Sequence, residues 1–203
     1  MFYQGASGTV EWGTTKRRDV GEFIANQTAG KLGELAFGKF LHDRYGIDLE
    51  LSFLIETEVP GQDIVKVIRT EDERRIVRSP NIKVSIKTTK MQNFNLWVVE
   101  EEIARSDAFV LCRVELPSDQ LLRIVRDHEQ ISPVRNLIPQ PTGIQAEVAG
   151  FAWRKELQSK GATMKMVGAN GKVVQVLKRP QFIMLSGELR KSKDDWRNLA
   201  NAL

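Results

Sequence analysis

The chain has 203 residues and a formal net charge of +4, with 41% hydrophobic and 28% charged residues. This balance is typical of a globular protein with a substantial core and excludes a largely disordered chain. No stretch has the apolar length of a membrane span, the first residues lack the basic and apolar parts of a secretion signal, and the single Cys112 excludes an internal disulfide. We therefore expect one main domain that works in the cytoplasm and has no membrane partner.

Positive charge is concentrated toward the C-terminus. Residues 151–203 hold 11 basic against 4 acidic side chains, a net charge of +7, whereas residues 1–150 hold 19 against 22, a net charge of −3. A basic surface attracts polyanions such as nucleic acid. A basic segment is also a common solvated face, so charge alone leaves both interpretations open.

The composition divides the chain into three parts. Residues 1–18 are rich in glycine and threonine and lack periodicity, so they predict an arm, either a mobile terminus or a contact with a phosphate backbone or a second subunit. Residues 19–131 predict an α/β core. Residues 132–203 predict a basic, β-rich region that either completes the same domain or forms a small DNA-binding subdomain.

A helix is predicted for residues 20–45. It begins with a pattern similar to a capping box, Asp19 followed by Glu22, and Gly46 is placed to end it. The four glycines inside this stretch predict a break near residues 28–30, or else close packing of the helix against a sheet or nucleic acid.

One acid of this helix lies among apolar neighbours. Glu34 shares its side of the helix with Phe37 and Leu41, which follow three and seven residues later. Such an acid needs a structural salt bridge, exposure at the edge of the apolar stripe, or a role in a metal site. The sequence alone leaves these alternatives open.

Three strands are predicted after the helix. Residues 49–58 alternate with period two, residues 64–68 follow directly on Asp63, and residues 81–90 form the third strand after a charged turn at residues 71–75. In the third strand the aliphatic side chains alternate with polar ones, so Ser85 and Lys87 lie on one face. Antiparallel pairing of the second and third strands would bring Asp63 level with Lys87.

The rest of the chain continues the α/β pattern, with a mixed central β-sheet flanked by helices. The remaining predicted elements are a helix at about residues 98–106 with a solvated face at residues 100–102, a buried strand at residues 108–115, a helix at residues 117–127, a loop at residues 132–143, a strand leading into a short helix at residues 144–157, a hairpin at residues 164–177, an extended run at residues 180–185, and a last helix from Asp194 or Asp195.

A helix glutamate, a strand acid and a strand lysine in this order resemble the PD-(D/E)xK nuclease superfamily, which includes type II restriction enzymes and Holliday-junction resolvases. The resemblance covers roughly residues 30–115. Glu34 in the Gly-Glu-Leu sequence of residues 33–35 is similar to the helix glutamate, and Asp63 in the Gly-Gln-Asp-Ile sequence of residues 61–64 is similar to the first acid. The Ser85-Ile86-Lys87 sequence is similar to the (D/E)xK tripeptide, with Ser85 in place of the second acid.

The resemblance implies a restriction-endonuclease-like core and a catalytic site of Glu34, Asp63, Ser85 and Lys87. Asp63 and Glu34 would be the ligands of Mg²⁺, and Lys87 would orient or help to deprotonate the attacking water, or stabilise the developing charge as a cation.

A serine hydroxyl binds Mg²⁺ less well than a carboxylate, so the site needs an acid from elsewhere in the chain. Glu34 is the first candidate for this ligand, and Glu56 and Glu58 are second candidates.

The predicted function is a Mg²⁺-dependent endonuclease that cuts double-stranded DNA, as a restriction or other genome-defence enzyme. Cutting two strands is the family reason to expect a homodimer. The alternative is a non-catalytic nucleic-acid-binding protein on a degenerate nuclease scaffold. The candidate nucleic-acid contacts are Lys90, Asn93, Lys155, Lys178, Arg179, Arg190 and Lys191.

Overall fold

The computed structural model describes residues 20–52, 63–120, 123, 126, 136–140, 142–167 and 173–203. The described residues do not include the arm predicted at residues 1–18 or the candidate acids Glu56 and Glu58. Residues 121, 122, 124, 125 and 127 of the helix predicted at residues 117–127 also lie outside them. The turn of the hairpin predicted at residues 164–177 also lies outside them.

The described chain is mixed α/β, as predicted. No helix in these parts of the chain is long and apolar enough to cross a membrane. The elements are, in chain order, α1 (Val20–Tyr45), β1 (Ile47–Leu51), β2 (Ile64–Glu71), β3 (Arg74–Arg78), β4 (Val84–Lys90), β5 (Asn95–Val99), α2 (Glu100–Ile103), β6 (Ala108–Glu115), β7 (Gln145–Trp153), α4 (Arg154–Lys160), β8 (Thr163–Val167), β9 (Val173–Leu185), the 3-10 turn η3 (Ser186–Glu188) and α5 (Lys193–Ala202).

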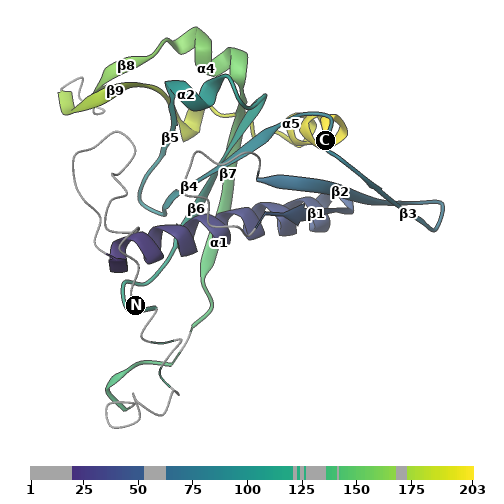
Figure 1. Cartoon of the computed structure of the whole chain (residues 1–203), viewed down its shortest axis with the longest axis horizontal. Coiled ribbons are helices and arrows are strands. Elements are labelled where there is room, and N and C mark those ends of the chain that lie inside the picture. Colours follow the sequence, from purple (N-terminus) through teal and green to yellow (C-terminus); the bar gives the residue numbers. More distant parts are fainter. Residues whose placement is uncertain are drawn as a thin grey trace, which may run out of the picture.

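The described strands form three small sheets, in the orders β1-β2-β3, β4-β6-β7 and β5-β9-β8. The second sheet is mixed, because β4 runs parallel to β6 while β7 is antiparallel to β6. A parallel pair needs a connection that crosses a face of the sheet. Here β5 and α2 make that crossing, so α2 is carried back toward β4 (Figure 1).

The long helix α1 packs on β4, β6, β7 and β1 (Figure 1). It runs unbroken for 26 residues, so the predicted break near residues 28–30 is wrong and the alternative, close packing of the helix against a sheet, is confirmed. Packing against the sheet outweighs the low helix propensity of its glycines. Gly33 shows why a small residue is needed, because a Cβ there would lie 1.9 Å from the Thr88 Oγ1 atom of β4.

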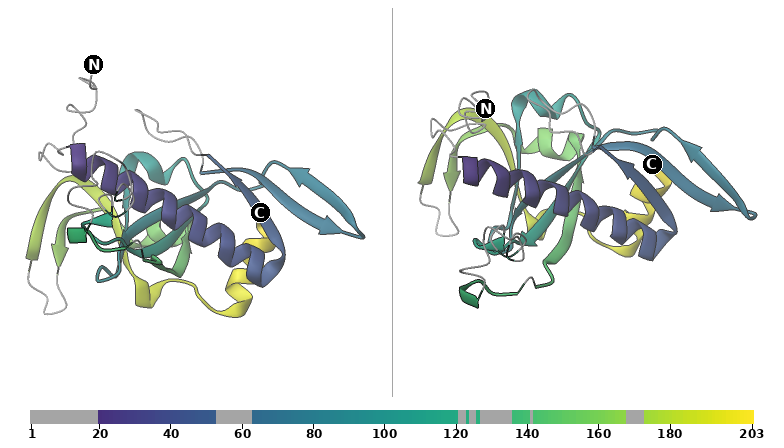
Figure 2. Two further views of the ribbon diagram at one scale, coloured as in Figure 1. Left: turned by 90° about the horizontal axis from the view of Figure 1, so that it is seen from below. Right: turned by 60° about the horizontal axis from the view of Figure 1, so that its bottom comes forward.

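The charged turn predicted at residues 71–75 is a two-residue hairpin connection, and a strand that was not predicted, β3, begins at Arg74. Asp72 and Glu73 form this connection with positive φ angles of 47° and 62°, as a type I′ turn requires. β3 then pairs with β2, and Figure 2 shows the two strands projecting from the body of the molecule. β2 therefore lies between β1 and β3, and the predicted antiparallel pairing of the Asp63 strand with the Lys87 strand is wrong.

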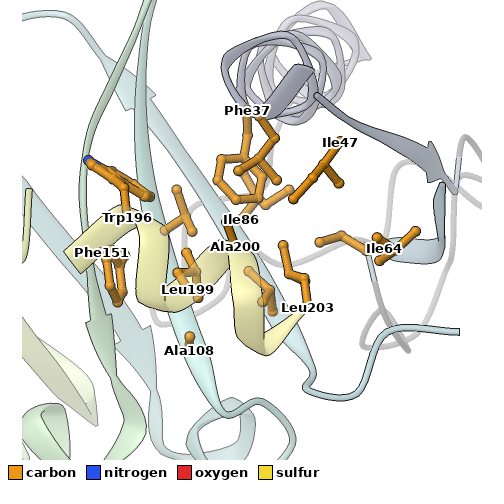
Figure 3. Packing of buried hydrophobic residues seen from close by; sticks show 14 of the residues in the cluster. Phe37, Ile47, Ile64, Ile86, Ala108, Phe151, Trp196, Leu199, Ala200 and Leu203 are labelled. Atoms are coloured by element: carbon orange, nitrogen blue, oxygen red, sulfur yellow. The ribbon is translucent and has the colours of Figure 1, made fainter. Parts of the chain in front are cut away.

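The C-terminal helix α5 closes the main hydrophobic core (Figure 3). The Trp196 ring lies 4.8 Å from the Phe40 ring of α1 and 4.9 Å from the Phe151 ring of β7, measured between centroids. Leu199 and Leu203 are fully buried beside them. β7 and α5 thus share this core with α1, whereas Leu157 of α4 and Phe182 of β9 belong to a second buried cluster.

The contact between α1 and β4 can be tested with a pair of glycines. Gly33→Ala should destabilise the protein, because its methyl group overlaps Thr88, with an expected loss of about 1–3 kcal/mol in the free energy of unfolding. Gly30→Ala is the matched control, since no atom lies within 4 Å of the added methyl group. It should stabilise the helix by about 0.5–1 kcal/mol. Urea unfolding followed by circular dichroism measures both, and equal effects would contradict the close contact.

Candidate functional site

Asp63 reaches the Lys87 strand through its side chain. It directly precedes β2, and its Oδ2 atom accepts a hydrogen bond of 2.6 Å from the backbone N–H of Ile86 in β4. β4 is the end strand of its sheet, so this amide is not used by the pairing with β6 on the opposite edge. The carboxylate is therefore fixed next to Lys87 although the two strands do not pair.

Charges from several elements meet at Asp63. Burial raises the pKa of its carboxyl, and the Ile86 hydrogen bond and the positive charges of Lys87 and Lys31 oppose that shift. The negative charge of Glu102 raises the pKa of Asp63 further. Asp63 is thus a carboxylate that a nearby cation would favour in its ionised form.

Lys87 lies on the Ser85 face of β4 and pairs with an acid that the sequence did not identify. Its Nζ atom lies 2.6 Å from Glu102 Oε2, and only 25% and 17% of the two side chains are exposed. The prediction that residues 100–102 form a solvated face is therefore wrong for Glu102, although Glu100 and Glu101 are exposed. Three consecutive glutamates carry no periodic signal, and the return of α2 toward β4 decides which one faces inward.

Glu34 is buried on α1, with 6% of its surface exposed. Lys31 Nζ lies 2.9 Å and 3.0 Å from its two carboxylate oxygens and also donates to the backbone oxygen of Ser52 at 2.6 Å. The salt-bridge interpretation of this acid is thus confirmed. Burial still raises the pKa of Glu34, and the charge of Asp63 adds to the rise. The buried Cys112 thiol of β6 is also affected, because desolvation and the charge of Glu34 raise its pKa.

The structure therefore brings Glu34, Asp63 and Lys87 into one electrostatically connected site and adds Glu102 to it. Among the described residues, no group of three metal-ligating side chains is close enough to hold an ion by itself. Mg²⁺ in phosphoryl-transfer sites is commonly held by one or two carboxylates together with phosphate oxygens and water. Asp63 with either neighbouring glutamate matches that donor set. The negative charge of Asp63 raises the pKa of Glu34, and that of Glu102 raises the pKa of Asp63, so a nearby divalent cation would stabilise the ionised carboxylates.

Two of the predicted nucleic-acid contacts carry charges that are already matched. Arg179 pairs with Glu101 at 3.3 Å, and Arg190 lies 2.8 Å from both Glu156 and Asp195. A DNA phosphate would have to displace these acids before it could bind Arg179 or Arg190. The role of the two arginines in phosphate binding stays a prediction.

The other predicted contacts differ in position. Lys90 lies at the end of β4, about 10 Å from Lys87 at 3.3 Å per residue. It lines an open cavity of about 450 Å³. Asn93 is in the turn that follows, where its Oδ1 atom accepts from the Asn95 amide. Lys155 and Lys191 are exposed, and the side chain of Lys178 lies outside the described atoms.

Comparisons of the chain with protein-family models, with curated proteins and with solved structures find no match. The candidate site is therefore supported by its geometry and charges. Of these, the Asp63 hydrogen bond to β4 and the Lys87–Glu102 pair are the most specific.

The shifted pKa of Asp63 predicts a pH-dependent effect of Asp63→Asn on stability. The pKa of Asp63 is higher in the folded than in the unfolded state, so the wild type loses stability as pH rises from the ordinary value of 3.8 through the folded pKa. Asparagine keeps an acceptor for the Ile86 amide without the buried charge. The variant should therefore unfold at a higher temperature near neutral pH, and the difference should vanish below pH 3.8.

Calorimetry at a series of pH values measures this difference, since ~1 kcal/mol moves the midpoint by about 2–4 °C in a domain of this size. The exposed acid Glu115 provides the control, and Glu115→Gln should show no such trend. A constant difference for Asp63→Asn at all pH values would contradict the burial of a charged carboxylate.

Proposed function

We propose that the chain is a Mg²⁺-dependent endonuclease that hydrolyses phosphodiester bonds of double-stranded DNA in the cytoplasm, as a PD-(D/E)xK restriction or genome-defence enzyme. One observation carries the proposal. Asp63 accepts a hydrogen bond from the backbone amide of Ile86, the residue between Ser85 and Lys87. Its negative charge also raises the pKa of the buried Glu34 on α1. The first acid, the lysine and the helix glutamate of the resemblance thus converge although they come from three elements.

Glu102 supplies the acid that is missing at Ser85. Its carboxylate lies 2.6 Å from the Lys87 amine and interacts electrostatically with Asp63. Because α2 returns toward β4, Glu102 contacts the face of β4 that carries Ser85 and Lys87. We propose that Asp63 and Glu102 are the principal metal ligands and that Glu34, already neutralised by Lys31, acts as an outer ligand.

The chain's own residues divide the work of hydrolysis. The chemistry supplied by bound Mg²⁺ is polarisation of the scissile phosphate and activation of a water molecule. Asp63 is held in place by the Ile86 amide, so little reorganisation is needed when substrate binds. Lys87, held by Glu102, orients the attacking water or stabilises the negative charge of the transition state.

The second candidate function is nucleic-acid binding without catalysis. It is favoured by the neutral Ser85 and by the absence, among the described residues, of three acids grouped as a metal site. Metal dependence separates the two candidates, because a binding module needs no Mg²⁺. For the nuclease, cleavage of both strands would be achieved by a homodimer, with Lys90, Asn93, Lys155 and Lys191 as candidate DNA contacts.

The nuclease proposal predicts Mg²⁺-dependent cleavage of plasmid or phage DNA by the purified chain. Asp63→Ala and Lys87→Ala should each lower the cleavage rate by at least about 100-fold, because each removes a group that acts on the transition state. A chelator should abolish cleavage by the wild type. Agarose gels of time courses measure all three. Intact DNA in every reaction would favour the binding module, and cleavage that survives both substitutions would place the site elsewhere.

The role of Glu102 can be tested against its neighbours on α2. Glu102→Gln keeps the size of the side chain and should lower cleavage by at least about 100-fold. Glu100→Gln is the matched control, since Glu100 is exposed in the same turn, and it should keep the wild-type rate within about threefold. Single-turnover cleavage at several Mg²⁺ concentrations is the measurement. If Glu102→Gln needs no more Mg²⁺ than the wild type and cuts equally fast, the assignment of Glu102 is wrong.

A further inference from the structure

An open cavity of about 450 Å³ lies where the chain enters β4 and leaves α2. It is lined by Lys83, Ala104, Arg105, Asp107 and Arg154. Three of these five residues are basic and one is acidic. None of them was singled out by the sequence patterns, because they come from three separate segments that the crossover and the β6-β7 pairing bring together.

Hydrogen bonds fix the floor of this cavity. Asp107 accepts from the Lys83 amide through Oδ2 at 3.0 Å and donates its own amide to the Lys83 oxygen at 2.7 Å. Its Oδ1 atom accepts from Arg154 Nη2 at 2.8 Å, and Arg154 Nη1 donates to the Ala104 oxygen at 3.1 Å. The cavity is therefore built on a connected backbone and side-chain network rather than on loose surface residues.

The same network leaves a surplus of positive charge at the rim. Arg154 and Asp107 balance one another as an ion pair. Within the described parts of the chain, no ion pair engages the side chains of Lys83 or Arg105, and Arg105 and Lys83 are exposed. In contrast, Lys160 and Arg179 form ion pairs with the acids Glu188 and Glu101 of the protein. The cavity is thus a preformed position for an anion with two cations still available.

The cavity is tied to the candidate catalytic site by two short connections. Lys83 precedes Lys87 by four residues, a spacing that keeps both on one side of an extended chain and about 13 Å apart. Arg105 lies in the turn just after α2, and its backbone amide donates to the backbone oxygen of Glu102 at 3.0 Å. The two catalytic groups and the two surplus cations therefore come from the same two segments.

We propose that this cavity binds a backbone phosphate of the DNA strand that is being cut, within about four nucleotides of the scissile phosphate. The estimate follows from the separation of about 13 Å and a rise of about 3.4 Å per nucleotide. Lys83 and Arg105 contact the phosphate, and Arg154 with Asp107 holds them in position. The cavity sets the register of the strand so that the next phosphates meet Asp63, Lys87 and Glu102. This inference rests on the proposed nuclease function.

The test is DNA binding in the presence of a chelator, where no cleavage interferes. The double variant Lys83→Gln/Arg105→Gln changes two exposed side chains, so it should fold normally. Its affinity for a fluorescein-labelled mixed-sequence duplex, measured by anisotropy, should fall about tenfold or more. The slope of log affinity against log salt concentration should become shallower by about 0.9, the value for one lost phosphate contact.

Arg44→Gln/Lys193→Gln is the matched control, since it removes the same charge from two exposed positions that no ion pair engages within the described residues. It should leave the slope unchanged, and an equal change in both double variants would overturn the proposal as a general charge effect. In Mg²⁺ the cavity variant should need more DNA for half-maximal single-turnover cleavage while its rate at saturation stays within about threefold of the wild type. A lower saturating rate with unchanged affinity would also overturn it.

Two further outcomes separate this inference from the nuclease proposal. If the wild type binds DNA but cuts none, a slope change confined to the cavity variant supports the phosphate site and removes the nuclease. If the cavity variant binds and cuts DNA like the wild type, the nuclease proposal is supported and the cavity proposal is wrong. Free phosphate is the other ligand that could occupy the cavity, and calorimetric titration with inorganic phosphate tests it. If inorganic phosphate binds as tightly as DNA, the cavity is a site for free phosphate and the proposal is wrong.

Discussion

The hydrogen bond from the Ile86 amide to the Asp63 carboxylate is the contact on which the candidate site depends. It crosses between two sheets, since Asp63 leads into β2 and Ile86 belongs to β4. The amide is available only because β4 is an end strand. The bond partly offsets the cost of burying the carboxylate and leaves it beside Lys87 and Glu102. Ile64 and Ile86 pack in the same buried cluster, so the bond fixes the position of the carboxylate where the two sheets share a core.

The resemblance proposed Glu34, Asp63 and Lys87 as members of the candidate site, but the sequence did not predict the path by which they meet. The predicted strand pairing failed because Asp72 and Glu73 adopt positive φ angles and turn β2 back into β3. Period-two patterns give the faces of a strand, yet the partner of that strand is decided by turn geometry and tertiary packing. Asp63 therefore reaches β4 through its side chain rather than through a ladder of backbone hydrogen bonds.

Glu102 and the unbroken α1 are two further features that depend on tertiary packing and could not be predicted from local sequence. In the Glu100–Ile103 segment the sequence offers three equivalent acids, and only the crossover from β4 to β6 selects the one that meets Lys87. In α1 the glycines lower helix propensity, but Gly33 lies where the helix touches Thr88 of β4. Local propensity predicted a break, whereas the packing of a long helix on a sheet determines the result. The mixed α/β class, the strands of the hairpin at residues 164–177 and the last helix needed no such tertiary information, and they were predicted correctly.

The position of positive charge matters more for DNA binding than its total. The C-terminal segment has a net charge of +7, yet many of its cations are matched within the protein, including Arg154, Lys160, Arg179, Arg190 and Arg197. A matched cation must give up its partner before it can bind phosphate, and that exchange gains little. Lys83 and Arg105 add little to the charge of their segments, but no ion pair engages them within the described chain, and they precede and follow the candidate residues Lys87 and Glu102 by four and three positions. The proposed phosphate contact therefore lies at the β4–α2 end of the fold, whereas the paired cations of the basic C-terminal segment stabilise the protein itself.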